Sequence, residues 1–546
     1  MSNPSQVPSA AHGFDTIVVG GGSAGCVMAS RLSERSAHSV LLLEAGVDAP
    51  PGREPDDILD IYPASYYNKS YMWPALKVHW RDATNSPAIG YDQARIIGGG
   101  SSVMGMVALR GAPDDYDEWE RLGAAGWGWD SVLPYFRKLE HNVRGADAYH
   151  GDDGPLWASD IESRHPLIDA FIDAAAELGI APNRDFNGAT QEGAGYYQAT
   201  VGKGRRWSAA TAYLKPARER RNLVVKPNAH ATRIVIENGR AVGVEFRTSR
   251  GMEIARAKGE VIVSGGVYGS PQLLLLSGIG PGDHLNEMGI DVTHNLAPVG
   301  ANLHDHFNSY VAWRSTKTGT FNELHRSPFR KLAAGARYLV GRDGPMTAIA
   351  THAGILTRTD PRFDRPDLQI NTYLWSIETR DRSGMHPHKW PGFSMSPVHL
   401  RPEGRGLVSL ASPDPLAPPK IQFRFMESAH DVDAMIRGVR LARKLAEQPA
   451  LKPYIAEEVV PGPAVRSDEQ LVEDIRNRGV SNLHPVGTCR MGTGRDAVVD
   501  PRLRVHGIRG LRVADASIMP LVVGGNTNAP SVMIGEKCAA MVLEDA

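Results

Sequence analysis

The stretch Asp15-Thr-Ile-Val-Val-Gly-Gly-Gly-Ser-Ala-Gly25 decides the fold of this chain. Its β-branched run stops at glycines, as a buried strand of a parallel sheet does. Helix-compatible sequence follows from Ser23 to Arg35, and a second apolar run, Ser39–Leu43, ends at Glu44. The order of strand, glycine loop, helix and strand predicts a βαβ unit.

The glycine loop has the spacing of a dinucleotide-binding motif. Gly20 permits a tight turn, Gly22 lets the backbone approach a pyrophosphate, and Gly25 allows helix and strand to pack closely. The helix N-terminus would face the phosphates, and Glu44, which lies 19 residues beyond Gly25, can bind a ribose hydroxyl. We therefore expect an adenine dinucleotide. The alternative is a glycine-rich turn without a ligand, and the motif alone does not distinguish NAD from FAD.

Length and composition restrict the class of protein. A chain of 546 residues predicts two or more packed units, and 42% hydrophobic with 22% charged residues excludes a disordered chain. The net charge of −1 and the lack of a Lys/Arg run predict neither nucleic acid nor an anionic membrane as a partner. The three cysteines form no CxxC pair, and the N-terminus lacks the features of a signal peptide. We expect a cytoplasmic protein without membrane insertion.

Further strand and turn signals follow along the chain. Glu260–Ser264 runs straight into a glycine pair, and Leu511–Asp515 is again a short apolar run. Thr232–Ile236 and Ala241–Phe246 flank an Asn-Gly pair, which predicts a hairpin. These patterns predict one binding domain assembled from separated segments, with a second domain between them. Other expectations are a helix over Pro166–Gly179, a surface excursion over Pro51–Gly90, an alternating stretch at Asp367–Leu374, and a last helix from Ala529-Pro530 capped by Asn528.

Longer motifs identify a family resemblance over nearly the whole chain. The motifs are Arg95–Ser102 followed by Arg110-Gly111, Asp115–Trp119, Gly126–Trp129, Val132–Phe136, Gly266–Gly280 and Val299–His306. In this order they resemble the glucose–methanol–choline (GMC) family of flavin oxidoreductases, although Val267 stands where a smaller residue is usual. The resemblance implies an α/β fold: a Rossmann-like FAD-binding domain built from discontinuous segments, plus an α+β substrate domain with an antiparallel sheet.

The expected domain boundaries follow the motifs. The FAD-binding domain would comprise residues 1–160, 211–305 and 481–546, and the last segment would carry the catalytic residues. The substrate domain would comprise residues 161–210 and 306–480.

The resemblance also implies which residues contact the flavin. The family's glycine-serine stretch places Gly99, Ser102 and Met104-Gly105 beside the isoalloxazine ring. Met104 replaces a polar residue of many relatives, and plain packing explains it as well as a role in shaping the pocket. Val103 stands where some relatives attach FAD covalently through a histidine, so we expect non-covalent FAD. The expected cofactor-binding residues are Gly20, Gly22, Ser23, Ala24, Gly25, Glu44, Ala45, Gly99, Ser102, Met104, Gly105, Ala231, Asp515, Ala516, Thr527 and Asn528.

The expected catalytic residues lie near the C-terminus. His484 begins a segment that resembles the family's catalytic-histidine motif. Alcohol oxidation removes the hydroxyl proton as hydride leaves for flavin N5, and a neutral imidazole can accept that proton. Asn526 stands where relatives carry His or Asn, and its amide can orient the alcohol but cannot act as a base. Asn528 is a rival for this role, with a helix N-cap as the alternative.

Three other groups invite competing interpretations. Cys489 follows His484 closely, but nothing around it indicates an activated thiol. A metal site at His304, Asp305 and His306 is not expected, because no further ligand cluster accompanies this loop. The aromatic residues Tyr373, Trp375 and Trp390 would either form a wall of the substrate site or pack in the core.

The expected activity is FAD-dependent oxidation of a primary alcohol or an aldehyde hydrate, with O2 or another acceptor taking the electrons. The motifs resemble bacterial hydroxymethylfurfural and aryl-alcohol oxidases as well as choline dehydrogenases, and the spacing from Ser102 to Arg110 favours the oxidase-like group. We therefore favour furan or benzylic alcohols. The alternatives are a choline-type dehydrogenase, a hydroxynitrile lyase that contains FAD, and a catalytically silent FAD-binding protein.

Overall fold

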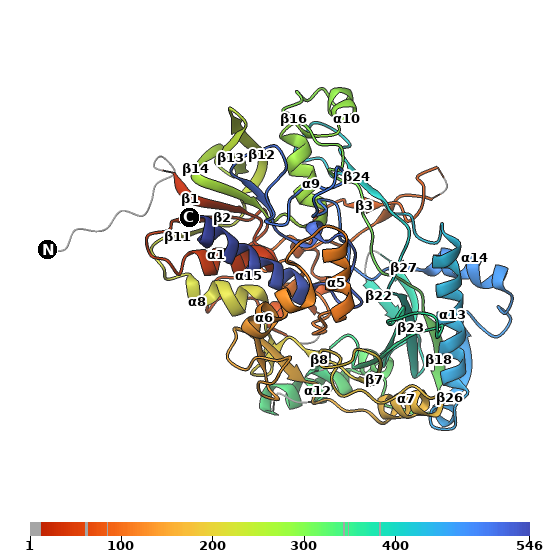
Figure 1. The fold of residues 1–546 in the computed structure, drawn as a ribbon. Helices are drawn as coiled ribbons and strands as arrows, with labels where there is room; N and C mark the ends of the chain where they lie inside the picture. Colours follow the sequence, from red (N-terminus) through yellow and green to blue (C-terminus); the bar gives the residue numbers. More distant parts are fainter. Residues whose placement is uncertain (1–12, 61–63, 85, 342–343, 348, 382–383) are drawn as a thin grey trace.

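Two β-sheets on opposite sides of the molecule organise the chain (Figure 1). The computed structural model describes residues 13–60, 64–84, 86–341, 344–347, 349–381 and 384–546. In this part of the chain no helix has the length and apolar character needed to cross a membrane. The domain boundaries given above stay a prediction.

The first sheet contains the predicted βαβ unit. Its parallel part runs in the order β11 (Leu223–Lys226), β2 (Val40–Leu43), β1 (Phe14–Val19), β14 (Gly251–Val263) and β28 (Leu511–Val513). Segments from the start, the middle and the end of the chain therefore form one sheet, which confirms the expected discontinuous assembly.

A hairpin extends this sheet on its antiparallel side. The strands β12 (His230–Glu237) and β13 (Arg240–Thr248) pair with each other, and β13 pairs with β14. Asn238 and Gly239 have φ values of 50° and 70°. Positive φ at both central residues is what a two-residue type I′ turn requires, so the Asn-Gly prediction is confirmed.

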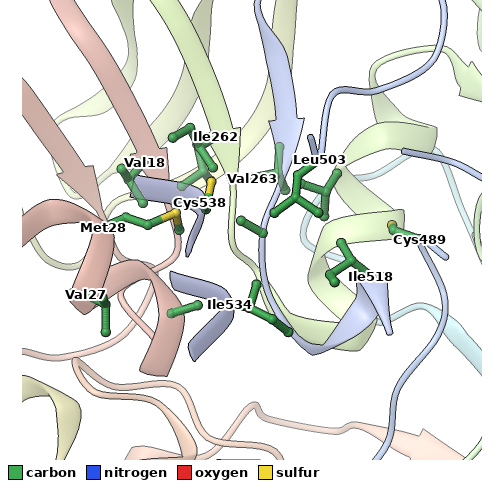
Figure 2. Close-up of a cluster of buried hydrophobic side chains, with 14 of the residues drawn as sticks. Val18, Val27, Met28, Ile262, Val263, Cys489, Leu503, Ile518, Ile534 and Cys538 are labelled. Carbon is green, nitrogen blue, oxygen red and sulfur yellow. The ribbon is translucent and has the colours of Figure 1, made fainter. Parts of the chain in front are cut away.

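The first and last helices pack together against the parallel sheet. They are α1 (Ser23–Leu32) and α15 (Asn528–Asp545). Figure 2 shows Val18 and Ile262 of the sheet beside Met28 of α1 and Cys538 of α15, all within one buried apolar cluster. This packing fixes the N-termini of both helices beside the carboxyl ends of the strands.

The prediction that Asn528 caps the last helix is wrong. The helix begins at Asn528 itself, and Thr527 occupies the N-cap position without a side-chain hydrogen bond. The Asn528 Oδ1 atom instead accepts a hydrogen bond from Ser23 Oγ at 2.8 Å. Because α15 starts directly against α1, this amide links the two helix N-termini and does not cap its own helix.

The second sheet is antiparallel, as expected for the substrate domain. Its order is β26 (Ile455–Val460), β18 (Val311–Ser315), β23 (Gly392–His399), β20 (Leu368–Tyr373), β19 (Ala353–Thr357) and β7 (Gly193–Tyr196). β20 is the predicted alternating stretch. β17 (Phe307–Asn308) joins β23 to β27 (Val480–Ser481). The predicted helix near residue 170 is α7 (Pro166–Glu177), and α13 (Ala429–Ala446) also packs on this domain's core.

The segment from Pro51 to Gly90 is only partly the surface excursion that we expected. It forms α2 (Asp56–Leu59), α3 (Ala64–Tyr67), η1 (Lys69–Tyr71), β3 (Lys77–Val78) and β4 (Ile89–Gly90). Tyr71, Met72, Leu76 and Val78 are buried, because the apolar side chains of this segment pack back onto the protein.

Other helices complete the fold around the two sheets. They are α4 (Gly100–Val103), α5 (Pro113–Arg121), α6 (Trp129–Leu139), α8 (Lys215–Ala217), α9 (Gly266–Leu276), α10 (Gly282–Glu287), α11 (Phe321–Arg326), α12 (Pro328–Gly341) and α14 (Asp468–Arg478).

Candidate active site

A cavity of about 1140 Å³ receives side chains from both sheets. The parallel sheet contributes its glycine loop and Glu44, and the antiparallel sheet contributes Asn371 and Ser396. His484 and Asn526 line the same cavity. Every expected cofactor-binding residue except Gly25 and Ser102 lines it as well.

Gly25 and Ser102 have other positions for physical reasons. A Cβ atom on Gly25 would lie 1.9 Å from the carbonyl oxygen of Gly20, so this glycine serves the close packing of helix and strand. Ser102 is fully buried, and its hydroxyl donates to the carbonyl of Ile97 at 2.8 Å. Ser102 therefore holds the loop before α4 and does not face the cavity.

The end of the cavity at the glycine loop fits an adenine dinucleotide. Gly22 lines it, and a Cβ atom placed there would meet no protein atom within 4 Å. The N-terminus of α1 carries no side-chain cap, so its first N–H groups are available to an anion. These features suit a pyrophosphate.

Glu44 has acceptor capacity left for a ribose hydroxyl. Its Oε2 accepts the N–H of Gly21 at 2.8 Å, and its Oε1 accepts the N–H of Gly46 at 2.6 Å. Burial raises the pKa of Glu44, while these two N–H donors favour the ionised form. A carboxylate oxygen has two lone-pair sites, so both oxygens can accept one more hydrogen bond.

His484 and Asn526 meet in the wall of the same cavity. The Nδ2 atom of Asn526 lies 2.9 Å from Nε2 of His484, although the two residues are 42 positions apart. Burial lowers the pKa of His484 to about 4, so its imidazole is neutral at neutral pH. A neutral ring nitrogen beside an amide donor can accept a proton from a bound hydroxyl group.

Two residues behind His484 belong to the site and were not recognised as such from the sequence. The Nδ1 atom of His306 lies 3.1 Å from Nδ1 of His484, with the two rings nearly perpendicular. The Asp305 carboxylate accepts the backbone N–H of His484 at 2.9 Å. Burial raises the pKa of Asp305 to about 7 and lowers that of His306 well below its usual value. His306 is therefore a neutral neighbour of the expected base.

The strand pairing explains this contact. β17 follows His306 directly, and it pairs with β27, which lies just before His484. Both histidines lie in family-like motifs, but no local pattern in the sequence indicated that they meet. His304, from the same loop, has a different role: its Nε2 accepts the N–H of Val522 at 2.9 Å, and its Nδ1 lies 2.6 Å from the carbonyl oxygen of Asn302.

A polar wall from the antiparallel sheet leads to His484. Ser396 Oγ lies 3.2 Å from Oδ1 of Asn308, and Asn308 donates to Oδ1 of Asn482 at 3.1 Å. The Nδ2 atom of Asn482 lies 3.3 Å from Nδ1 of His484. All four residues line the cavity. Neutral hydrogen-bonding groups thus connect the substrate-domain sheet with the expected base.

The expected aromatic wall exists for two of its three residues. Tyr373 and Trp375 line the cavity and stack with nearly parallel rings whose centroids are 5.9 Å apart. Trp390 does not line it and stacks on His388 at 4.2 Å. Trp390 is therefore a packing residue.

Cys489 is fully buried, which agrees with the expectation that its thiol is unreactive. Burial raises the pKa of its thiol well above the usual value, so it is not a thiolate at neutral pH.

This fold and cavity suit a dinucleotide-binding enzyme with a neutral histidine in its site. Two family models described as GMC oxidoreductase match residues 14–308 and 402–535. The chain therefore belongs to the GMC oxidoreductase family, and it is an FAD-dependent oxidoreductase that acts on alcohols.

Individual relatives cover nearly the whole chain. The chain is 41% identical to an oxygen-dependent choline dehydrogenase of Rhizobium rhizogenes, over 97% of this chain and 95% of the relative. It is 38% identical to an alcohol dehydrogenase [acceptor] of Pseudomonas putida, over 97% and 96%. A solved fungal aryl-alcohol oxidase aligns with a TM-score of 0.82 at 26% identity, over 98% of this chain and 99% of that structure.

Proposed function

We propose that this enzyme oxidises a primary alcohol on an aromatic ring, such as a furan or benzylic alcohol, or the hydrate of an aldehyde. His484 is the base and Asn526 orients the alcohol oxygen. The observation that carries the proposal is the 2.9 Å contact between His484 Nε2 and Asn526 Nδ2 in the wall of the cavity.

The proposed role of His484 as the base sets the tautomer of its ring. To accept the hydroxyl proton at Nε2, a neutral imidazole must carry its own proton on Nδ1. The Nδ1 atom of His306, at 3.1 Å, can accept a hydrogen bond from that N–H. Asp305 fixes the His484 backbone at the same time. His306 and Asp305 thus position the ring, and Asn526 donates to the oxygen that loses the proton.

FAD, bound without a covalent link, would supply the hydride acceptor, and O2 or another carrier would take up the electrons. Gly22 and the first turn of α1 would hold its pyrophosphate, and Glu44 its ribose. The uncapped first turn of α15, at Thr527 and Asn528, presents the positive end of that helix to the cavity.

Residues at and after β20 in the cavity wall favour an aromatic substrate. The stacked pair of Tyr373 and Trp375 offers an aromatic surface to a flat ring, and Asn371 and Ser396 offer neutral polar groups. The fungal aryl-alcohol oxidase shares this fold over nearly its whole length. A neutral aromatic alcohol with polar ring substituents suits both features.

A second candidate substrate is choline. Glu378 lines the same cavity as Tyr373 and Trp375, and a carboxylate beside aromatic rings can bind a quaternary ammonium group. The 41% sequence identity with a choline dehydrogenase, over 97% of this chain, supports this alternative.

An anaerobic alcohol panel tests the proposal. The purified enzyme is mixed with a furan alcohol, a benzylic alcohol or choline, and flavin bleaching is followed. We expect the aromatic alcohols to reduce the flavin at least about tenfold more efficiently than choline. Faster reduction by choline would favour the second candidate. Cleavage of hydroxynitriles without bleaching by any alcohol would identify a lyase.

Two further measurements complete the test. Peroxide detection under air, beside an artificial electron acceptor, distinguishes an oxidase from a dehydrogenase. Acid precipitation should release the flavin into the supernatant, and a yellow pellet would contradict non-covalent binding.

A further inference from the structure

The helix α12 exposes the most accessible large apolar side chains among the described residues. Phe329, Leu332, Leu339 and Val340 are 85%, 73%, 73% and 91% exposed, whereas the next, Met252, is 59% exposed. Figure 1 shows α12 at the lower edge of the molecule. One short helix therefore carries an apolar face that no described part of the chain covers.

This face is one continuous stripe. At about 100° per residue, positions 329, 332, 336, 339 and 340 lie on one side of an α-helix. The opposite side of the helix packs against the protein. Ala334 and Tyr338 on that side are buried, and the Tyr338 hydroxyl donates to Asp60 Oδ1 at 3.0 Å. The contacts of the buried side thus fix the direction in which the apolar stripe points.

Basic side chains accompany the stripe. The sequence from Leu324 to Gly341 contains Arg326, Arg330, Lys331 and Arg337 and no acidic residue. All four basic residues are exposed, and Arg330 also pairs with Glu323 at 2.9 Å. This local positive charge is not apparent from the sequence, because the whole chain has a net charge of −1 and the basic residues are spaced apart along it.

We infer that α12 is a docking helix for the surface of an anionic lipid bilayer. An amphipathic helix with basic residues beside an exposed apolar face lies in the plane of the membrane interface. With 14 residues, α12 is shorter than the ~20 residues that a membrane-spanning helix needs. A second copy of this chain fits less well, because a symmetric contact would bring the two sets of basic residues together.

The docking helix is connected to segments that line the active-site cavity. Tyr338 bonds Asp60, and Tyr66 and Tyr67, which soon follow Asp60, line the cavity. On the other side, Ala350 and Thr351 line it shortly after α12 ends. Docking would therefore attach the bilayer to segments beside the substrate site.

Flotation of the FAD-loaded enzyme with lipid vesicles tests this inference. Vesicles are made of phosphatidylcholine with or without phosphatidylglycerol. The variant is Phe329→Ser/Leu332→Ser/Val340→Ser, and its matched control is Met252→Ser/Ile254→Ser/Leu407→Ser, at exposed apolar positions elsewhere. We expect the wild type and the control to bind anionic vesicles at least about tenfold more strongly than neutral ones, less so at high salt.

The α12 variant should lose at least about tenfold of this binding while retaining its FAD and its alcohol oxidation in solution. Equal binding of the wild type to both vesicle types, or full binding by the α12 variant, would overturn the inference. A wild-type dimer that the α12 variant converts to a monomer would also overturn it, since the stripe would then be a subunit interface.

Discussion

The two ends of the active-site cavity are built in different ways. At the parallel sheet, the protein offers backbone groups: the space over Gly22 and the free N–H groups of α1. At the antiparallel sheet, it offers side chains such as Asn371 and Ser396 from adjacent strands. A site made of backbone requires glycines at fixed spacing, whereas a site made of side chains can change its chemistry one residue at a time.

The strongest way to break the backbone-built end is Gly25→Ala. The new Cβ atom would lie 1.9 Å from a carbonyl oxygen, so α1 must shift from β1. We expect a loss of about 3 kcal/mol or more in stability and little FAD-loaded protein, measured by thermal unfolding and flavin content.

Gly22→Ala is the matched control, because its Cβ atom would meet no protein atom within 4 Å. This variant should keep the stability of the protein but bind FAD about tenfold more weakly. If the two alanine variants behaved alike, the distinction between packing glycine and ligand-facing glycine would be wrong.

The side chains expected to act on the alcohol are tested next, by Asn526→Ala. Removing the amide that lies 2.9 Å from His484 Nε2 should slow anaerobic flavin reduction about 10- to 100-fold, because the alcohol oxygen loses its orienting donor. Stopped-flow absorbance measures the rate. Asn526→His, which restores a donor, should recover most of it, and an unchanged rate in Asn526→Ala would remove Asn526 from the site.

The same contrast explains how much the sequence could predict. Local backbone requirements reveal themselves in local patterns, as the loop at Gly20–Gly25 and the turn at Asn238-Gly239 show. His484 and Asn526 were predicted from a family resemblance, and the structure brings them together. The contact of His306 with His484 spans 178 positions and depends on the pairing of β17 with β27, which no local pattern encodes.

The exposed apolar face of α12 and the contact of Asn528 with Ser23 could not be predicted from the sequence for a related reason. An amphipathic pattern indicates that a helix has two faces, but the neighbours decide which face is covered. Asn528 has a good N-cap residue type, yet the start of α15 against Ser23 gives its amide a different partner.

A smaller effect on flavin reduction is expected when His306, which contacts the His484 ring, is replaced. His306→Leu removes the group 3.1 Å from His484 Nδ1, so the ring loses a partner that fixes its tautomer. Flavin reduction should slow about tenfold, and the acid limb of its pH profile should move. His306→Asn, which can place a polar atom near the same position, should restore both. Equal pH profiles in all three proteins would leave His306 with a packing role only.

The smallest effect is expected from pH in the wild type. Because burial lowers the pKa of His484 to about 4, the base is already neutral at pH 6 to 8 and becomes protonated only as the pH falls through about 4. The rate constant for flavin reduction should therefore change little across the neutral range and fall in acid. His306 faces this ring and Asp305 holds the backbone N–H of the same residue, so Asp305→Asn tests whether the carboxyl, with its pKa near 7, adds a second step. A single fall near pH 6.5 that Asp305→Asn does not change would indicate a solvated histidine.

The most direct test of the proposed chemistry is the rate constant for anaerobic flavin reduction by an aromatic alcohol in His484→Ala. If His484 is the base, the rate constant should fall by about 10²- to 10⁴-fold while the flavin content stays that of the wild type. A His484→Ala enzyme that retains FAD and is reduced at the wild-type rate would contradict the account.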